Sequence, residues 1–182
     1  MKKRASESGP FQLFIGIIVF GMALGIGAYL FDMVNCWKCN ELLKAQVTNL
    51  REAISSVGKG DVNSRDSMLV QLEDLGSCAK GIYIRQVRED EGLQCESFCP
   101  QHPNSCWVVI PESTCGGEVL DFECADISGD TVITADETIL GRLSSSDNPW
   151  YENAFAISHT ISLTIEKTGP SEIYIGRPGG RE

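Results

Sequence analysis

The chain has 182 residues, a net charge of −10 and eight cysteines. The excess of acidic side chains argues against nucleic-acid binding, which needs clustered lysine and arginine to contact phosphates. A chain of this length can bury one sizeable core. It contains no GxSxG, HExxH or phosphate-binding-loop signature, so we do not expect an enzyme.

The first feature along the chain is an apolar segment from Phe11 to Phe31. No charged residue occurs between Glu7 and Asp32. Because about 20 apolar residues in a helix cross a hydrocarbon core of ~30 Å, this segment predicts a transmembrane helix. The alternatives are a buried helix of a soluble domain and a cleaved secretory signal, and the segment is long for either.

The charges that flank this segment predict its orientation. Lys2, Lys3 and Arg4 precede it, whereas charges of both signs follow it. Positive charge is retained on the cytoplasmic side of membranes. We therefore expect residues 1–10 to be a cytoplasmic leader and the chain beyond residue 31 to lie outside, in a single-pass membrane protein.

The helix is expected to continue beyond the membrane, because no proline or glycine occurs from Asp32 until Gly58. Apolar residues and cysteines recur there at steps of three and four, which places them on one helical face. We predict one helix from about residue 10 to 57, with an amphipathic part over 32–57. Its apolar face is expected to pack on the outer domain, and a coiled-coil seam with another copy is the alternative. This stripe consists of Cys36, Cys39, Leu43, Val47, Leu50, Ile54 and Val57.

All eight cysteines follow the predicted span. In an oxidising compartment their even number predicts up to four disulfides, but the spacing does not decide the pairing. Cys36 and Cys39 are expected to bond to cysteines of the outer domain and clamp it to the helix. A zinc site and a redox role for the Cys36-Trp-Lys-Cys39 motif are the alternatives. The cysteines are Cys36, Cys39, Cys78, Cys95, Cys99, Cys106, Cys115 and Cys124.

Residues 58–176 are expected to form a disulfide-rich, mostly antiparallel β domain. Together with the long helix, this makes the expected fold class α+β. A short helix is expected first, starting at Ser64 or Asp66 and ending at Leu75. His159 falls on the apolar side of the last long alternating run and is expected to be packed. Residues 177–182 are expected to form a flexible tail. Strands are expected at 82–87, 107–110, 119–122 and 154–166, the last joined through a turn at 168–171 to a hairpin partner at 172–176.

Small residues are spaced along the predicted span. Gly21 and Gly25 form a GxxxG motif, and Ala23 and Gly27 repeat the same spacing. Small residues four apart let helices approach closely in lipid, so we expect this surface to pack against other helices. The alternative is the ordinary frequency of glycine in membrane helices.

Residues 126–137 resemble an EF-hand loop, and more closely the calcium loops of dockerin-type modules. Calcium takes six or more hard oxygen ligands, which this loop can supply, so calcium is a possible cofactor. The loop departs from the pattern at its sixth position, where Thr131 replaces glycine. An acidic surface loop is the alternative. The candidate ligands are Asp126, Ser128, Asp130, the Val132 carbonyl, Thr134 and Glu137.

The plan of the first sixty residues resembles that of type IV pilin-like proteins, in particular the archaeal kind. A short basic leader precedes an apolar helix that continues as an amphipathic helix into a mostly β domain. Arg4, Ala5 and Ser6 look like a prepilin-peptidase site, with the cut between Ala5 and Ser6. The sequence departs at Pro10, where bacterial pilins carry glutamate, and its eight cysteines exceed the number in most archaeal pilins.

This resemblance implies a filament subunit or minor pilin that serves adhesion or surface attachment. The implied partners are the membrane, copies of the same chain or other pilin-like subunits, and a prepilin peptidase. A monomeric single-pass protein whose outer domain binds a ligand or partner is the first alternative. An extracytoplasmic redox or metal protein is the second.

Overall fold

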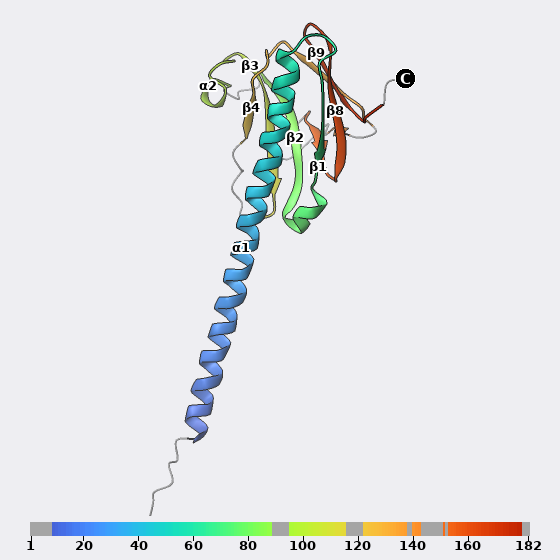
Figure 1. Cartoon of the computed structure of the whole chain (residues 1–182). Coiled ribbons are helices and arrows are strands. Elements are labelled where there is room, and N and C mark those ends of the chain that lie inside the picture. The colour runs from blue at the N-terminus through green and yellow to red at the C-terminus, as the bar shows by residue number, and fades with distance from the viewer. Residues whose placement is uncertain are drawn as a thin grey trace, which may run out of the picture. The chain divides into compact units, whose positions relative to one another are not determined.

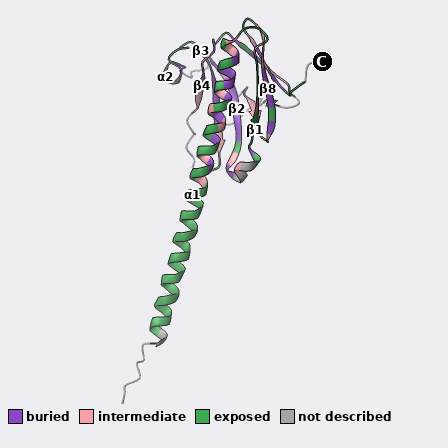
Figure 2. Ribbon diagram, in the orientation of Figure 1, coloured by how far each residue is buried: buried purple, intermediate pink, exposed green. Residues whose placement is uncertain are grey.

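Helix α1 begins at Gly9 and ends at Lys59 in the computed structural model, close to the predicted limits. The structure describes residues 9–88, 95–115, 122–137, 140–142, 151 and 153–179. Two units are distinguished, Met1–Lys38 and Cys39–Glu182, and we call the second unit the head. In the first unit every side chain of α1 from Phe11 to Asn35 is exposed, as the green ribbon in Figure 2 shows.

The head contains two β-sheets (Figure 1). One has the order β1-β8-β9-β5 and the other the order β4-β3-β2-β7-β6. All described pairings are antiparallel except that of β5 with β9. The predicted α+β class is confirmed. The strands are β1 (Arg65–Val70), β2 (Ala79–Arg88), β3 (Ser105–Ser113), β4 (Glu123–Ala125), β5 (Val132–Ala135), β6 (Gly141–Arg142), β7 (Phe155–Ile157), β8 (Ile161–Gly169) and β9 (Glu172–Gly176).

The main core of the head is formed by α1 together with strands of both sheets. Figure 2 shows buried residues in purple on the helix and on these strands. The apolar stripe predicted for α1 is buried there from Cys39 onward, because a face of this kind must be removed from water. Period-2 alternation in β2 and β8 directs one set of apolar side chains to the same core. The helix contributes Leu43, Val47, Leu50, Ala53, Ile54 and Val57, and the strands contribute, among others, Ile82, Ile84, Val109, Leu163, Ile165, Ile173 and Ile175.

A smaller core covers the opposite face of β2 and β3. It contains Val87 and Val108 together with the buried cysteines Cys95, Cys99 and Cys106. Its aromatic part is a pair of tyrosine rings, Tyr83 and Tyr151, with ring centroids 4.5 Å apart. The Tyr83 hydroxyl donates to Glu112 over 2.5 Å, and burial together with this carboxylate raises the pKa of Tyr83. Because β3 is covered by a core on each face of its sheet, most of its side chains are buried, and its sequence is an almost continuous apolar run.

The helix predicted between Ser64 and Leu75 is wrong. This segment forms β1 and a 3-10 helix, η1, from Glu73 to Cys78. Every residue of β1 pairs with β8, from Arg65 opposite Glu166 to Val70 opposite Ile161. Pairing with a strand about a hundred residues away overrides local helix propensity, which is a weak determinant.

The strand predicted over 154–166 is interrupted at Ser158–Thr160, and its two halves join different sheets as β7 and β8. At the break the Thr160 hydroxyl accepts hydrogen bonds from the backbone N–H groups of Leu72 and Glu73, over 3.1 and 3.0 Å. His159 lies in this break and is exposed, so the expectation that it is packed is wrong. Strands 82–87, 107–110 and the hairpin at 172–176 are confirmed, whereas 119–121 lie outside the described residues.

The end of α1 is held by a side chain from β8. The Lys167 ammonium donates to the carbonyl oxygens of Gly58 and Gly60, each over 2.7 Å. These carbonyls belong to the last turn of the helix and the residue that follows it, where orphan acceptors and the negative end of the helix dipole favour a cation. The contact therefore joins the helix terminus to the sheet that contains β1 and β8.

Two leucines of α1 provide a matched test of this core. Leu50 has no exposed surface, whereas Leu42 is 56% exposed on the same helix. We expect Leu50→Ala to lower the free energy of unfolding of the head by about 2–5 kcal/mol, because it leaves a cavity. Leu42→Ala is expected to change it by less than about 0.5 kcal/mol. Urea unfolding in detergent measures both, and equal effects would contradict the packing.

Candidate functional site

The first candidate site is the apolar surface of α1. Gly21, Gly25 and Gly27 are exposed, and a methyl group built on any of them meets no heavy atom within 4 Å. Ala23 is exposed as well. By length and composition this helix is able to cross a membrane, and its most apolar part contributes nothing to the interior. The surface is therefore open to lipid or to another helix. Arg4, Ala5 and Ser6 lie outside the described residues.

The second candidate site is the cysteine framework, and all eight cysteines are in the disulfide state. Cys39 of α1 is bonded to Cys78 at the end of η1, with the Cα atoms 6.5 Å apart. Cys36 and Cys115 are also disulfide-bonded. The expected disulfides are thus confirmed, and the expectation that Cys39 joins the helix to the β domain is confirmed with them.

The start of the helical part of the head is fixed by polar contacts around this bond. The Ser113 hydroxyl, at the end of β3, donates to the Asn40 side chain over 2.8 Å. The backbone N–H of Thr114 donates to the Cys78 carbonyl over 2.7 Å. Helix, η1 and β3 are therefore tied together at one end of the head, covalently through Cys39 and by hydrogen bonds through its neighbours.

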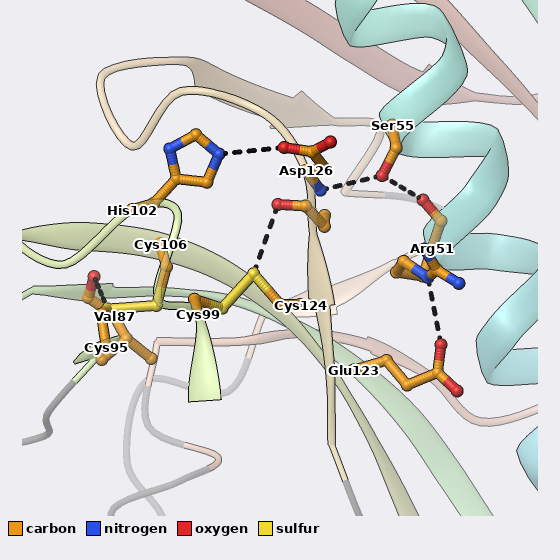
Figure 3. The surroundings of a disulfide bond; sticks show 11 residues. Arg51, Ser55, Val87, Cys95, Cys99, His102, Cys106, Glu123, Cys124 and Asp126 are labelled. Atoms are coloured by element: carbon orange, nitrogen blue, oxygen red, sulfur yellow. Dashed lines mark hydrogen bonds and ion pairs between the residues drawn. A yellow bond between two sulfur atoms is a disulfide. The ribbon is translucent and has the colours of Figure 1, made fainter. Parts of the chain in front are cut away.

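Two further disulfides involve cysteines at a short helix, α2, which runs from Cys95 to Phe98. Figure 3 draws both bonds. Cys95 is bonded to Cys106 of β3, and Cys99 to Cys124 of β4, with Cα separations of 5.9 and 5.6 Å. Each closes a short loop, which stabilises a fold by roughly 3 kcal/mol in the chain-entropy account. Because α2 has only one turn, these bonds rather than helix propensity hold it in place.

A polar cluster around Asp126 connects α1 to the segments that follow α2 and β4. The Lys59 ammonium contacts the Asp126 carboxylate. The His102 ring contacts it too, with 3.3 Å between Nε2 and Oδ1 (Figure 3). The backbone N–H of Asp126 donates to the Ser55 hydroxyl over 2.9 Å, and this hydroxyl donates to the carbonyl of Arg51. The hydrogen bond from Lys59, reinforced by His102, lowers the pKa of the Asp126 carboxyl.

The neighbouring residue of β4 makes a second polar contact with the helix. Glu123 accepts from the Thr48 hydroxyl over 2.6 Å and from the Arg51 guanidinium over 3.1 Å. Both carboxylate oxygens are therefore used within the head. Glu123 before Cys124 and Asp126 after it therefore both contact α1.

The calcium prediction for residues 126–137 finds no support in the structure. Val132 and Thr134 lie in β5, paired in parallel with β9, so this half of the loop is extended. The described residues contain no group of three or more acidic, histidine or cysteine side chains placed to hold a metal ion, so Asp126, Asp130 and Glu137 are not gathered. Calcium requires that its oxygen ligands converge.

The same segment has a structural task, since it carries the chain from β4 in one sheet to β5 in the other. The Trp107 indole donates to the Thr131 carbonyl over 2.8 Å, and the Gln86 amide donates to the Gly129 carbonyl over 2.6 Å. A side chain at Gly129 would overlap the carbonyl group of Ser105, so glycine is needed for this close approach. Ser128 accepts from the backbone N–H of Asp130.

No protein-family model matches the chain, and no curated protein or solved structure is detectably similar to it.

Sequence reasoning missed the contacts that join α1 to the strands. Lys59 and Asp126 are 67 residues apart, and Lys167 lies 109 residues from Gly58. No local spacing marks such pairs. The available signal is the acidic side chains on both sides of Cys124, Glu123 and Asp126, whose spacing does not indicate that they contact the helix.

The cysteine framework leads to a peptide-mapping prediction. Digestion without reductant is expected to give linked peptides for Cys39–Cys78, Cys95–Cys106 and Cys99–Cys124. Cys36 and Cys115 are expected to resist alkylation until reductant is added. A bond between Cys36 and Cys39, or alkylation of any cysteine in the native protein, would contradict the framework.

The Asp126 contact leads to a pH prediction. A carboxyl whose pKa is lower in the folded chain stabilises the fold above its unfolded pKa, and this stabilisation is lost as the pH falls through the folded value. Asp126→Asn is therefore expected to destabilise the head at pH 7, by less than about 1 kcal/mol because the pair is partly exposed. The difference from the wild type should disappear well below pH 4, since the wild-type carboxyl is then neutral too.

Urea unfolding at several pH values measures this difference. Asp130→Asn is the matched control, because it removes an exposed carboxylate from the same connection. A difference between wild type and Asp126→Asn that persists unchanged into strong acid would show that charge is not its cause.

Proposed function

We propose that the chain is a pilin-like, membrane-anchored surface protein, acting as a filament subunit or minor pilin in adhesion or surface attachment. The observation that carries the proposal is that α1 has an exposed apolar part followed by a part that packs in the head. Its residues from Phe11 to Asn35 are exposed, whereas those from Cys39 to Val57 provide one wall of the core of the head. A helix built in this way has an apolar surface available for a membrane or for other helices.

The state of the cysteines supports an outer location for the head. Four buried or half-buried cysteine pairs are stable in an oxidising compartment and are rare in the cytosol. The lysines and arginine before the span support the same orientation, with the N-terminus inside. The net negative charge suits a domain that must stay soluble on a cell surface.

Assembly would use the small residues of the span. Gly21 and Gly25 offer a surface on which a second helix can approach closely, and Ala23 and Gly27 extend the set. Van der Waals contact between helices of neighbouring copies would then hold the subunits together, while disulfides keep each head folded. In this proposal the head supplies the outer surface and α1 supplies the contacts.

A redox role for the CxxC motif has less support. Its cysteines are not bonded to each other, because the partner of Cys39 is Cys78. Cys39 is also buried, whereas an exchanging cysteine must be accessible to its substrate. Since all eight cysteines are oxidised, no thiolate is left to coordinate zinc.

Two measurements test the proposal: N-terminal sequencing of the mature protein and electron microscopy of sheared cell surfaces. We expect the mature chain to begin at Ser6, and we expect filaments that contain it. A variant with Arg4→Ser and Ala5→Leu should keep Met1 and lose the filaments, and Lys2→Ser is the control at the edge of the leader. An intact Met1 in the wild type, with no filaments, would identify a plain membrane anchor.

A further inference from the structure

The exposed apolar surface of α1 does not stop where the charged residues begin. Asp32 is the first charged residue after the predicted span. Beyond it, the side chains of Met33, Val34 and Trp37 are 59%, 47% and 63% exposed. Phe11 to Phe31 already matches a hydrocarbon core of ~30 Å. The helix therefore carries about two extra turns with large apolar side chains in water-facing positions, and something must cover them.

These extra apolar residues lie on one side of the helix. Leu30, Met33, Val34 and Trp37 follow one another at steps of three, one and three, which places them on one face. At about 100° per residue, Asp32 and Asn35 lie on the opposite side. We call the four residues the lower stripe. The boundary between apolar and polar surface is therefore oblique to the helix axis. On the side of the lower stripe the apolar surface extends to residue 37, whereas on the opposite side it ends at residue 32.

We infer that the lower stripe lies in the lipid–water interface and that the helix crosses the membrane at an inclination, with Trp37 facing the lipid. The inference rests on the membrane anchoring proposed above. Five residues correspond to about 8 Å along the helix axis, against a helix diameter of ~10 Å. An interface that follows this boundary requires an inclination of roughly 40°, which is at the upper end of the range of transmembrane helices.

The chemistry of the stripe favours lipid as its occupant. Tryptophan is enriched at membrane interfaces, where its ring is apolar and its N–H reaches polar groups. The apolar face is continuous with the lipid-facing span through Leu30, and the neighbouring Lys38 is exposed and able to extend its ammonium towards headgroups. A one-sided apolar segment is what an interfacial helix presents.

A second copy of the chain is the less suitable occupant for this part of the helix. At the same spacing the residues that follow Trp37 are Glu41 and Lys44, both charged and exposed. The lower stripe is therefore only about two turns long, whereas a helix pair in water needs several heptads of apolar residues. The stripe is long enough to rest on a membrane surface and too short to hold two helices together.

Fluorescence quenching in vesicles tests the inference. The full chain is reconstituted in phosphatidylcholine vesicles that carry a nitroxide either on the headgroup or at the centre of the acyl chain. The chain has three tryptophans, and comparison of the wild type with Trp37→Phe isolates the signal of Trp37. We expect the headgroup nitroxide to quench the wild type and this component to be lost in Trp37→Phe.

The matched control moves the indole to the opposite side of the helix, in the double variant Asn35→Trp, Trp37→Phe. Although position 35 is closer to the span, we expect its indole to escape the headgroup nitroxide and to be quenched by aqueous iodide. Equal quenching by headgroup nitroxide at both positions would mean an upright helix and would overturn the inference.

Two other results are distinguishable. If the protein floats with the vesicles but Trp37 is quenched by neither lipid nitroxide, protein covers the stripe and the inference fails while the anchor stands. If the protein does not float with vesicles, the proposed membrane anchoring fails and this inference fails with it.

Discussion

Burial of one face of α1 against two sheets is the constraint on which the head depends. Leu43, Leu50 and Ile54 have no exposed surface and belong to one core together with side chains of both sheets. Neither sheet has another described partner for its inner face. Without the helix, the apolar sides of β2 and β8 would face water, and sheets of this size need a covered face for stability.

The polar contacts and disulfides make sense as reinforcements of that packing. Cys39–Cys78 fixes the helix where it enters the head, and Lys167 holds it where it ends. Between these points Glu123 and Asp126 attach it to the segment around β4. The part of the helix that lies within the head is thus held at both of its ends and along its polar flank.

Periodic features of the sequence predicted much of this arrangement, because periodicity reports which side of an element is buried. The steps of three and four in α1 identified the residues from Cys39 to Val57 as a buried face, and alternation identified the run that contains β8. Short β-like apolar runs indicated β2 and β3, and the turn at 168–171 indicated β9. Those assignments depend only on local geometry, which the sequence contains directly.

The failures come from interactions between distant residues. Residues 65–70 became a strand because β8 was available to pair with them, and His159 became exposed because the chain changes sheets beside it. The calcium site at 126–137 stays a prediction without support: two carbonyls of this segment accept hydrogen bonds from Trp107 and Gln86, and its first carboxylate accepts one from Lys59. Composition alone does not distinguish a ligand for a metal from a partner for a side chain.

The central claim is that the span from Phe11 to Phe31 crosses a membrane with the head outside. Protease added to intact cells together with a membrane-impermeant reductant tests it most directly, with mass spectrometry of the fragment that survives. If the helix spans the membrane with the head outside, residues of the head are digested while a fragment containing Phe11 to Phe31 is protected. A head that stays intact until the membrane is opened, or the absence of any protected fragment, would contradict it.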